Sequence, residues 1–173
     1  LEKLLIYSRT SLQLDIGFLL PRLSNFSRLR ILELGGVIDS STDHDQVLAL
    51  PSVKELATLR MCNLKSIKKL IFQSMMPKLE SLSLEQMPNM KEIEGLAELK
   101  SLKKITLGRC ESLEKFELSG LHNLEEVCIY EGCRGLERLP SSSLANLVKL
   151  QRLKLKYLPS LREIAGIEGF KCL

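Results

Sequence analysis

The sequence has few aromatic residues and no long hydrophobic run, and these shortages exclude several classes of protein. It contains no Trp, three Tyr and five Phe among 173 residues. Its longest apolar run, Ile16 to Leu20, ends at Pro21 and is much shorter than the ~18 residues that a membrane-spanning helix needs. No small-residue cleavage pattern follows that run, so it does not resemble a signal peptide. We expect a soluble chain without a membrane span.

Catalytic, metal-binding and nucleotide-binding motifs are also missing. The two histidines, His44 and His122, lie near no Ser, Cys or Asp arrangement that repeats a nucleophile–base spacing. No C-x-x-C pair is present, and a zinc site formed by His122, Cys128 and Cys133 is disfavoured because Cys133 falls on a core position of the repeat described below. No G-x-x-x-x-G-K-S/T loop occurs. The sequence therefore predicts a chain that is not an enzyme and holds no metal or cofactor.

The charges and cysteines argue against two further classes. The net charge is +4, and residues 134–173 hold eight Lys or Arg against three Glu, so they carry +5 and the remaining residues −1. A nucleic-acid-binding domain is typically basic over a broad surface with interleaved aromatics, so we expect no nucleic-acid partner. The five cysteines are an odd number at no recurring pair spacing, which predicts reduced thiols rather than disulfides.

Leucine supplies 38 of the residues, and its spacing defines a repeat. The template L-x-x-L-x-L, continued by apolar residues, can be placed seven times, with successive copies 28, 27, 23, 23, 22 and 26 residues apart. This period is that of leucine-rich repeats and is shorter than that of ankyrin or tetratricopeptide repeats. We predict a single leucine-rich-repeat domain over residues 1–173, with repeats that start near residues 1, 29, 56, 79, 102, 124 and 150.

The L-x-L pair predicts one strand in each repeat, because its two leucines point to the same side of an extended segment. One repeat cannot bury that side alone, so neighbouring strands must stack in parallel. The predicted fold is an α/β solenoid, a leucine-rich-repeat horseshoe with a parallel concave sheet of about seven short strands. The convex side should be mostly irregular or short-helical, with a helical turn over Ile67–Met75 and a turn followed by a short helix from Pro140.

The ninth position of the repeat departs from the usual pattern. Typical leucine-rich repeats place an Asn there, which satisfies backbone groups of the turn. In this sequence the position is occupied by Arg9, Val37, Leu64, Met87, Cys110 and Leu158, with an extra residue before Cys133. We therefore expect the turn amides to find backbone or water partners and the solenoid to be less regular.

Three columns of residues flank the paired aliphatics and should form the concave face. The column before the pair is Lys3, Ile31, Thr58, Ser81, Lys104, Glu126 and Arg152. The column between its members is Leu5, Glu33, Arg60, Ser83, Thr106, Cys128 and Lys154, and the column after it is Tyr7, Gly35, Cys62, Glu85, Gly108, Tyr130 and Lys156. A surface selected only for solubility would be mostly Lys and Glu, whereas Tyr, Arg, Cys and small residues suit contact with a protein. The predicted protein-binding residues are Arg60, Cys62, Glu85, Lys104, Thr106, Glu126, Cys128, Tyr130, Arg152, Lys154, Lys156 and Tyr157.

Three basic residues alternate along the last predicted strand. Arg152, Lys154 and Lys156 should project from one face, with Tyr157 beside them and Glu126 opposite Arg152. We hypothesise that this basic rim docks an acidic patch, either on a ligand protein or on another module of the same chain. The alternative is a solvated charged strand that Glu126 partly neutralises.

Three stretches are similar to the repeats of one family. They are MMPKLESLSLEQMPNM at residues 75–90, LKKITLGRCESL at residues 102–113 and YLPSLREI at residues 157–164. Their P-x-L-x-x-L-x-L openings, the Cys-x-x-Leu at Cys110 and Cys133 and the irregular repeat length resemble plant intracellular nucleotide-binding leucine-rich-repeat (NBS-LRR) disease resistance proteins. The G-x-I-P signature of extracellular plant receptors does not appear.

The resemblance implies a cytoplasmic, non-catalytic recognition domain of a plant immune receptor. Such a domain senses a pathogen effector or a modified host protein and restrains a nucleotide-binding module of the same chain. ATP or ADP would bind only in that module, which is absent from these residues. Because Leu1 already falls within the repeat pattern, we expect the sequence to be an excerpt of a longer chain.

Two other interpretations stay open. A substrate-recognition arm of a ubiquitin ligase adaptor would use the same solenoid, and its upstream sequence would carry a short helical ligase-binding motif instead of a phosphate-binding loop. An extracellular receptor domain predicts paired cap cysteines and a glycan at Asn25, whose Asn-Phe-Ser triplet we expect to be unused.

Overall fold

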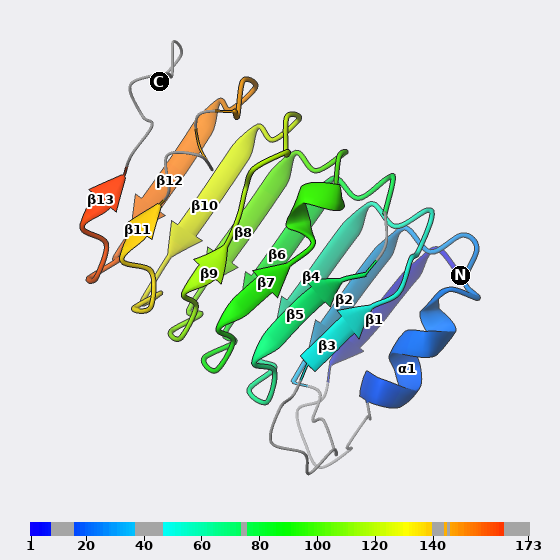
Figure 1. The fold of residues 1–173 in the computed structure, drawn as a ribbon. Coiled ribbons are helices and arrows are strands. Elements are labelled where there is room, and N and C mark those ends of the chain that lie inside the picture. The colour runs from blue at the N-terminus through cyan, green and yellow to red at the C-terminus, as the bar shows by residue number, and fades with distance from the viewer. Residues whose placement is uncertain (8–15, 37–46, 74–75, 140–143, 145, 165–173) are drawn as a thin grey trace.

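Short parallel strands dominate the computed structural model, which describes residues 1–7, 16–36, 47–73, 76–139, 144 and 146–164 (Figure 1). The longer strands are β1 (Lys3–Tyr7), β2 (Ile31–Gly35), β4 (Thr58–Cys62), β6 (Ser81–Glu85), β8 (Lys104–Gly108), β10 (Glu126–Tyr130) and β12 (Arg152–Lys156). The shorter strands are β3 (Val47–Leu50), β5 (Lys69–Phe72), β7 (Glu92–Glu94), β9 (Lys115–Phe116), β11 (Arg138–Leu139) and β13 (Glu163–Ile164). The described helices are α1 (Ile16–Leu23) and the single 3₁₀ turn η1 (Leu96–Glu98).

The seven longer strands form one parallel sheet in the order β1-β2-β4-β6-β8-β10-β12. Its register aligns the paired aliphatics of neighbouring repeats without a slip: Leu82 pairs with Ile105, and Leu84 pairs with Leu107. The same register continues from β1 through β12. The predicted solenoid with a parallel sheet of about seven strands is confirmed, and each predicted column of residues runs straight across that sheet.

The paired aliphatics face the interior and form its core. Leu82 and Leu84 are 0% exposed, as are their counterparts Ile105 and Leu107 on β8. The corresponding residues of the first and last strands, such as Leu155, are only half-buried because a described strand covers them on one side alone. Since full burial of such a side chain is worth about 1.5 to 3 kcal/mol, stacking of neighbours is what stabilises each strand.

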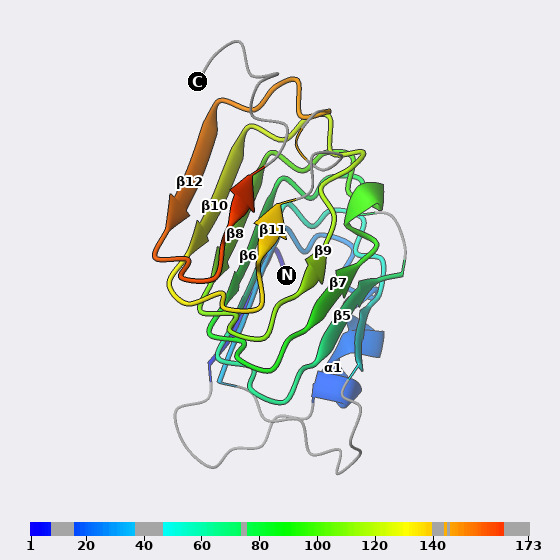
Figure 2. The ribbon, with the colours of Figure 1, turned by 60° about the vertical axis from the view of Figure 1, so that its left-hand side comes forward.

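Two further sheets line the opposite side of the solenoid, where the sequence predicted irregular or helical segments (Figure 2). β3, β5, β7 and β9 form a four-stranded sheet, and β11 pairs with β13. The helical turn predicted over Ile67–Met75 is wrong, because Lys69–Phe72 is β5 and pairs with β3 and β7. Leu70 and Phe72 are buried two residues apart, as on a strand, and the burial of Ile67 in the preceding turn created the helix-like spacing.

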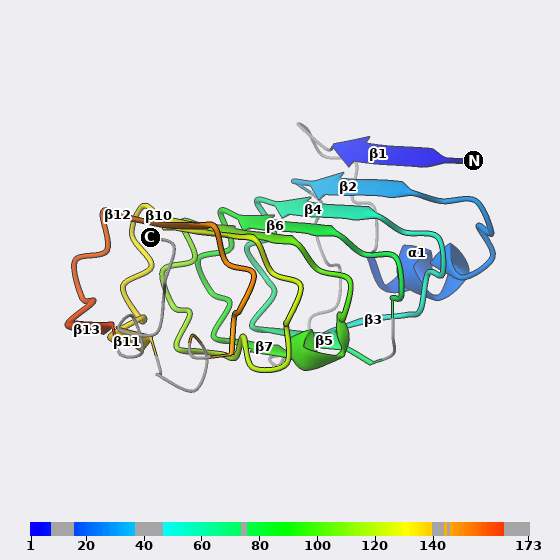
Figure 3. The ribbon, with the colours of Figure 1, turned by 90° about the horizontal axis from the view of Figure 1, so that it is seen from above.

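Helix α1 is the longer of the two described helices, and the sequence did not predict it. Ile16, Leu20 and Leu23 are buried at the spacing of one helical face, although Pro21 lies within the helix. The helix lies on the side of the seven-stranded sheet that carries the shorter strands (Figure 3). The turn predicted from Pro140 lies outside the described residues.

In the turns after the longer strands, where the usual asparagines are missing, backbone amides donate hydrogen bonds to backbone carbonyls of the next repeat. The residue that follows each longer strand from β2 onward has a φ between 52° and 63°; these residues are Gly36, Asn63, Gln86, Arg109, Glu131 and Tyr157. The amide of Asn63 donates to the carbonyl of Glu85 (3.0 Å), and that of Gln86 to the carbonyl of Gly108 (2.8 Å). The prediction of backbone partners for these amides is therefore confirmed.

Candidate protein-binding face

The side of the seven-stranded sheet that points away from the core is covered by no other described element. Figure 3 shows the other described strands and α1 on the opposite side of this sheet. We call the three columns of side chains on the uncovered side, together with Tyr157 after β12, the open face. All twelve residues predicted to bind protein belong to it.

Glu126 joins three neighbouring strands of the open face. Its carboxylate lies 3.2 Å from Lys104 Nζ on β8 and 3.3 Å from a guanidinium nitrogen of Arg152 on β12. Partial burial alone would raise the pKa of Glu126, but the hydrogen bonds and charges of Lys104 and Arg152 outweigh it and lower the pKa. The predicted neutralisation of Arg152 by Glu126 is therefore present, and Lys104 shares the same carboxylate.

Tyr130 spans the same part of the sheet in the column after the aliphatic pair. Its hydroxyl on β10 donates to the Glu85 carboxylate on β6 (2.7 Å), so the side chain crosses the intervening strand β8. Gly108 on β8 makes this crossing possible, because a Cβ atom there would lie 2.5 Å from Tyr130 Cζ. Burial and the hydrogen bond to Glu85 raise the pKa of Tyr130, so the phenol stays neutral well into the alkaline range.

The first strands repeat this arrangement of an aromatic ring over a glycine. A Cβ atom at Gly35 would lie 2.5 Å from the Tyr7 ring, and the Tyr7 hydroxyl donates to the carboxylate of Glu33. That hydrogen bond raises the pKa of Tyr7. Glu33 also lies 3.7 Å from a guanidinium nitrogen of Arg60. Cross-strand packing of an aromatic ring on a glycine of the neighbouring strand therefore occurs near each end of the sheet.

The four described cysteines fall into two pairs with different surroundings. Cys62 and Cys128 are half-buried on the open face, and Cys62 Sγ lies 3.6 Å from the side-chain oxygen of Gln86. Burial and the charge of Glu85 raise the pKa of Cys62, which disfavours its reactive thiolate. Cys110 is fully buried at the ninth repeat position and Cys133 at the tenth position of its own repeat, and the neighbouring Cys133 thiol together with burial raises the pKa of Cys110.

A shallow hollow of about 300 Å³ lies between β10 and the end of β12. Lys154, Lys156 and Tyr157 form one wall, and Cys128, Tyr130 and Glu131 form the other. Tyr157 is 80% exposed. Among the described residues neither lysine has an ion-pair partner, which distinguishes them from Arg152 on the same strand.

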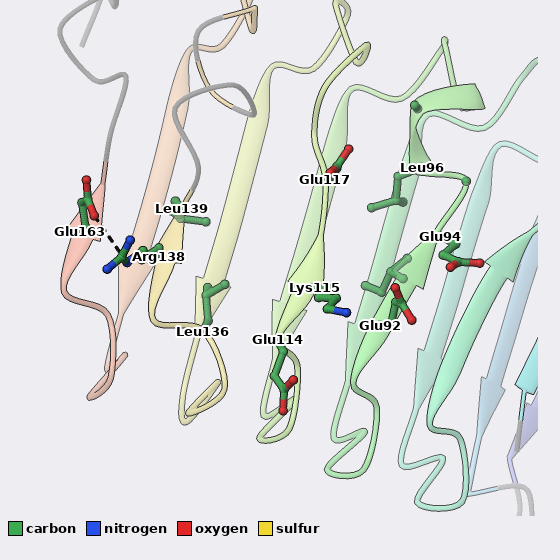
Figure 4. A pocket seen from close by; sticks show the side chains of 13 residues that line it. Glu92, Glu94, Leu96, Glu114, Lys115, Glu117, Leu136, Arg138, Leu139 and Glu163 are labelled. Atoms are coloured by element: carbon green, nitrogen blue, oxygen red, sulfur yellow. Dashed lines mark ion pairs between the residues drawn. The ribbon is translucent and has the colours of Figure 1, made fainter. Parts of the chain in front are cut away.

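A larger groove of about 670 Å³ lies on the opposite side, over β7, β9 and β11 (Figure 4). Five glutamates and two cations line it. Lys69 of β5 pairs with two of the glutamates, Glu92 at 3.4 Å and Glu94 at 2.6 Å, while Arg138 pairs with Glu163 at 3.6 Å. Its lining residues Ile93, Leu96, Leu136 and Leu139 are at most 4% exposed, and four of its seven charged residues take part in these ion pairs.

The predicted binding residues lie on or directly after five consecutive strands of the sheet, β4 to β12. Arg60 and Cys62 lie on β4 near the first strands, where they contact Glu33 and Gln86. The remaining residues lie on β6, β8, β10 and β12 or directly after β12; these are Glu85, Lys104, Thr106, Glu126, Cys128, Tyr130, Arg152, Lys154, Lys156 and Tyr157. The predicted columns include Gly108 and Glu33, but their roles were not predicted. Gly108 leaves room for the ring of Tyr130, and Glu33 accepts a hydrogen bond from Tyr7.

Residues of the turns also contribute, and one charge pattern in the sequence predicts their pairing. Arg109 Nε lies 2.5 Å from the Glu131 carboxylate across adjacent turns, which raises the pKa of Arg109. Both residues follow their strand at the same repeat position. Opposite charges at equivalent positions of consecutive repeats are therefore the pattern that predicts such a pair.

No model of a known protein family matches this chain, and a search of the solved structures finds no match. Within the described ranges, no group of three or more His, Cys, Asp or Glu side chains is arranged to hold a metal ion. No helix among the described residues is long and apolar enough to cross a membrane. Ideas about function therefore rest on the open face itself and on the repeat sequences.

Proposed function

We propose that this chain is a non-catalytic protein-recognition domain that binds its partner through the open face. The observation that carries the proposal is the uncovered sheet face, on which in-register columns place Tyr, Arg, Lys and Cys side chains next to one another. Six steps of about 4.8 Å give this face a length of about 29 Å, long enough for a folded protein to rest on it. Ion pairs and Tyr130 hold several of its side chains in place, which reduces the entropy lost on binding.

We further propose that the parent protein is a plant intracellular immune receptor, on the strength of the repeat resemblance in residues 75–90, 102–113 and 157–164. In this proposal a pathogen effector or an altered host protein binds the open face in the cytoplasm. Its binding competes with contacts to a nucleotide-binding module and shifts a resting switch toward the active state. ATP or ADP would bind in that module and not in these residues.

The test compares charge reversals on the two sides of the solenoid in the gene's full product. Arg60→Glu with Lys104→Glu changes the open face, and Lys115→Glu with Arg138→Glu makes two matched changes on the opposite side. We expect the first variant to lose ligand-dependent signalling at unchanged protein level, and the second to keep it. Equal signalling by both variants would remove the open face as the recognition surface.

The alternative is a substrate-recognition domain of a ubiquitin ligase adaptor, which would use the same uncovered sheet. The sequence encoded before these residues separates the two. A G-x-x-x-x-G-K-S/T loop there supports the receptor, whereas a short helical ligase-binding motif supports the adaptor. Co-purification with ligase subunits, lost when that motif is deleted, would establish the adaptor and overturn the receptor.

A further inference from the structure

The three basic residues of β12 differ in what faces them across the sheet. Arg152 pairs in register with Glu126, whose carboxylate also holds Lys104. Lys154 pairs in register with Cys128, and Lys156 with Tyr130, so neither has an acidic neighbour in its own column. The strand therefore carries one neutralised cation and two cations that no described side chain neutralises.

The acidic residue that lines the hollow is already paired. Glu131 lines the hollow with the two lysines, but its carboxylate is 2.5 Å from Arg109. Tyr130, on the same wall, donates its hydroxyl to Glu85 and remains neutral because its pKa is raised. The hollow thus offers two lysine ammonium groups without a competing free carboxylate.

The spacing of the two lysines defines a matching ligand. Lys154 and Lys156 are two residues apart on a strand, so they point to the same side about 6.6 Å from each other. Two acidic residues separated by one residue in an extended peptide have the same spacing and also point to one side. Adjacent acidic residues would point to opposite sides and reach only one lysine at a time.

We propose that this hollow is an anchor site for an extended acid-x-acid segment of a protein partner, whose two carboxylates pair with Lys154 and Lys156. Tyr157, 80% exposed beside them, offers its ring to a side chain that flanks the acidic pair. The inference rests on the proposed recognition role of the open face and adds the chemistry of the partner segment. Arg152 contributes little to the anchor because Glu126 already holds it.

The test uses two fluorescein-labelled peptides of identical composition, one with Glu-Ala-Glu and one with Glu-Glu-Ala at the centre of a Gly-Ser context. Fluorescence anisotropy measures their binding to the 173-residue chain at low salt. We expect the Glu-Ala-Glu peptide to bind about threefold to tenfold more tightly, because each exposed ion pair contributes a factor of a few. Equal affinity of the two isomers would show only nonspecific charge attraction and would overturn the proposal.

Two matched variants test whether Lys154 and Lys156 cause the preference for the Glu-Ala-Glu peptide. Lys154→Gln with Lys156→Gln should abolish the preference for the Glu-Ala-Glu peptide while leaving the thermal unfolding midpoint unchanged. Lys103→Gln with Lys149→Gln removes the same charge from lysines that lie in the turns before β8 and β12 and bind Glu80 and Asn123. This control should keep the preference, and an equal loss in both variants would overturn the anchor.

Failure of the anchor and failure of the recognition role give different results. If the peptide preference is absent while Arg60→Glu with Lys104→Glu still abolishes ligand-dependent signalling, the anchor is wrong and the open face remains the recognition surface. If the peptide preference is present but that open-face variant signals normally, the anchor binds acidic segments and the wider recognition role is wrong.

Discussion

The two sides of this solenoid are built from the same repeats but differ in regularity. On the open side, seven strands of five residues pair in one continuous sheet. On the opposite side, strands of two to four residues form a four-stranded sheet and a separate two-stranded one, with no described ladder between β9 and β11. The difference shows that the fixed L-x-L spacing determines the pairing of the seven-stranded sheet. The return segments vary in length, so their strands pair only where neighbouring repeats place them side by side.

The largest expected effect tests whether the two sides differ in packing as well as in pairing. Leu107 on the open-side sheet and Leu70 on β5 are both 0% exposed. Leu107→Ala and Leu70→Ala should each lower the free energy of unfolding by about 2 to 5 kcal/mol, because each leaves a cavity in the same core. Chemical denaturation measures both. A negligible loss at Leu107 would show that the repeat register is wrong, and a negligible loss at Leu70 alone would show that the opposite side is loosely packed.

The second prediction compares the stability lost when one glycine on each side is replaced by alanine. Gly95, before η1, has a φ of 78°, and a Cβ atom there would lie 2.3 Å from the carbonyl oxygen of Phe72. Gly95→Ala should therefore cost about 1 to 3 kcal/mol, because backbone has to move and the left-handed conformation is strained. Gly108→Ala meets only the movable ring of Tyr130 and should cost less. Thermal unfolding of both variants gives the order, and the reverse order would show that the ring of Tyr130 cannot move to accommodate the added methyl group.

A third prediction concerns Tyr130 and the pH dependence of the open face. Its pKa is raised in the folded protein, so the neutral phenol stabilises the fold fully below about pH 10, the unfolded value, and this contribution is lost as pH rises through the folded pKa. Glu85→Gln removes the charge and should shift the Tyr130 titration to lower pH. Ultraviolet absorbance of the phenolate measures it, with Tyr7→Phe and Tyr157→Phe together as the background that removes the two exposed tyrosines. An unchanged titration would show that the hydrogen bond is absent in solution.

The smallest effect compares two charge clusters that mirror each other. Glu126 lies between two cations on the open face, and Lys69 lies between two glutamates on the opposite side. Glu126→Gln should cost at most about 1 kcal/mol at low salt, because both partners are largely exposed. Since the folded pKa of Glu126 is lowered, its contribution is present above the unfolded carboxyl pKa and is lost as pH falls.

Salt distinguishes this contribution from packing. The difference between wild type and Glu126→Gln should shrink at 1 M salt, where charges a few ångströms apart are screened. Lys69→Met gives the corresponding measurement on the opposite side and should show the same direction of salt dependence. A loss at Glu126 that is independent of salt would show that its side chain acts by packing instead.

The candidate site was predictable to the extent that it depends on register. Once the L-x-L pairs were aligned, the columns of the open face followed, including the opposition of Glu126 and Arg152 that the structure confirms. The contact between Tyr130 and Glu85 was not predictable, because it skips a strand and depends on Gly108 leaving room for the ring. A column records which residues are neighbours but not how far a long side chain reaches.

The sequence by itself determined the repeat, the buried positions and the order of the seven strands, because a period of two within a period of 22 to 28 residues leaves one way to hide the leucines. Only the tertiary structure decided what the return segments become. Leu70 and Phe72 belong to a strand because β3 and β7 lie on either side of β5 to accept its backbone hydrogen bonds. Apolar spacing along one segment cannot record such partners, since they come from other turns of the solenoid.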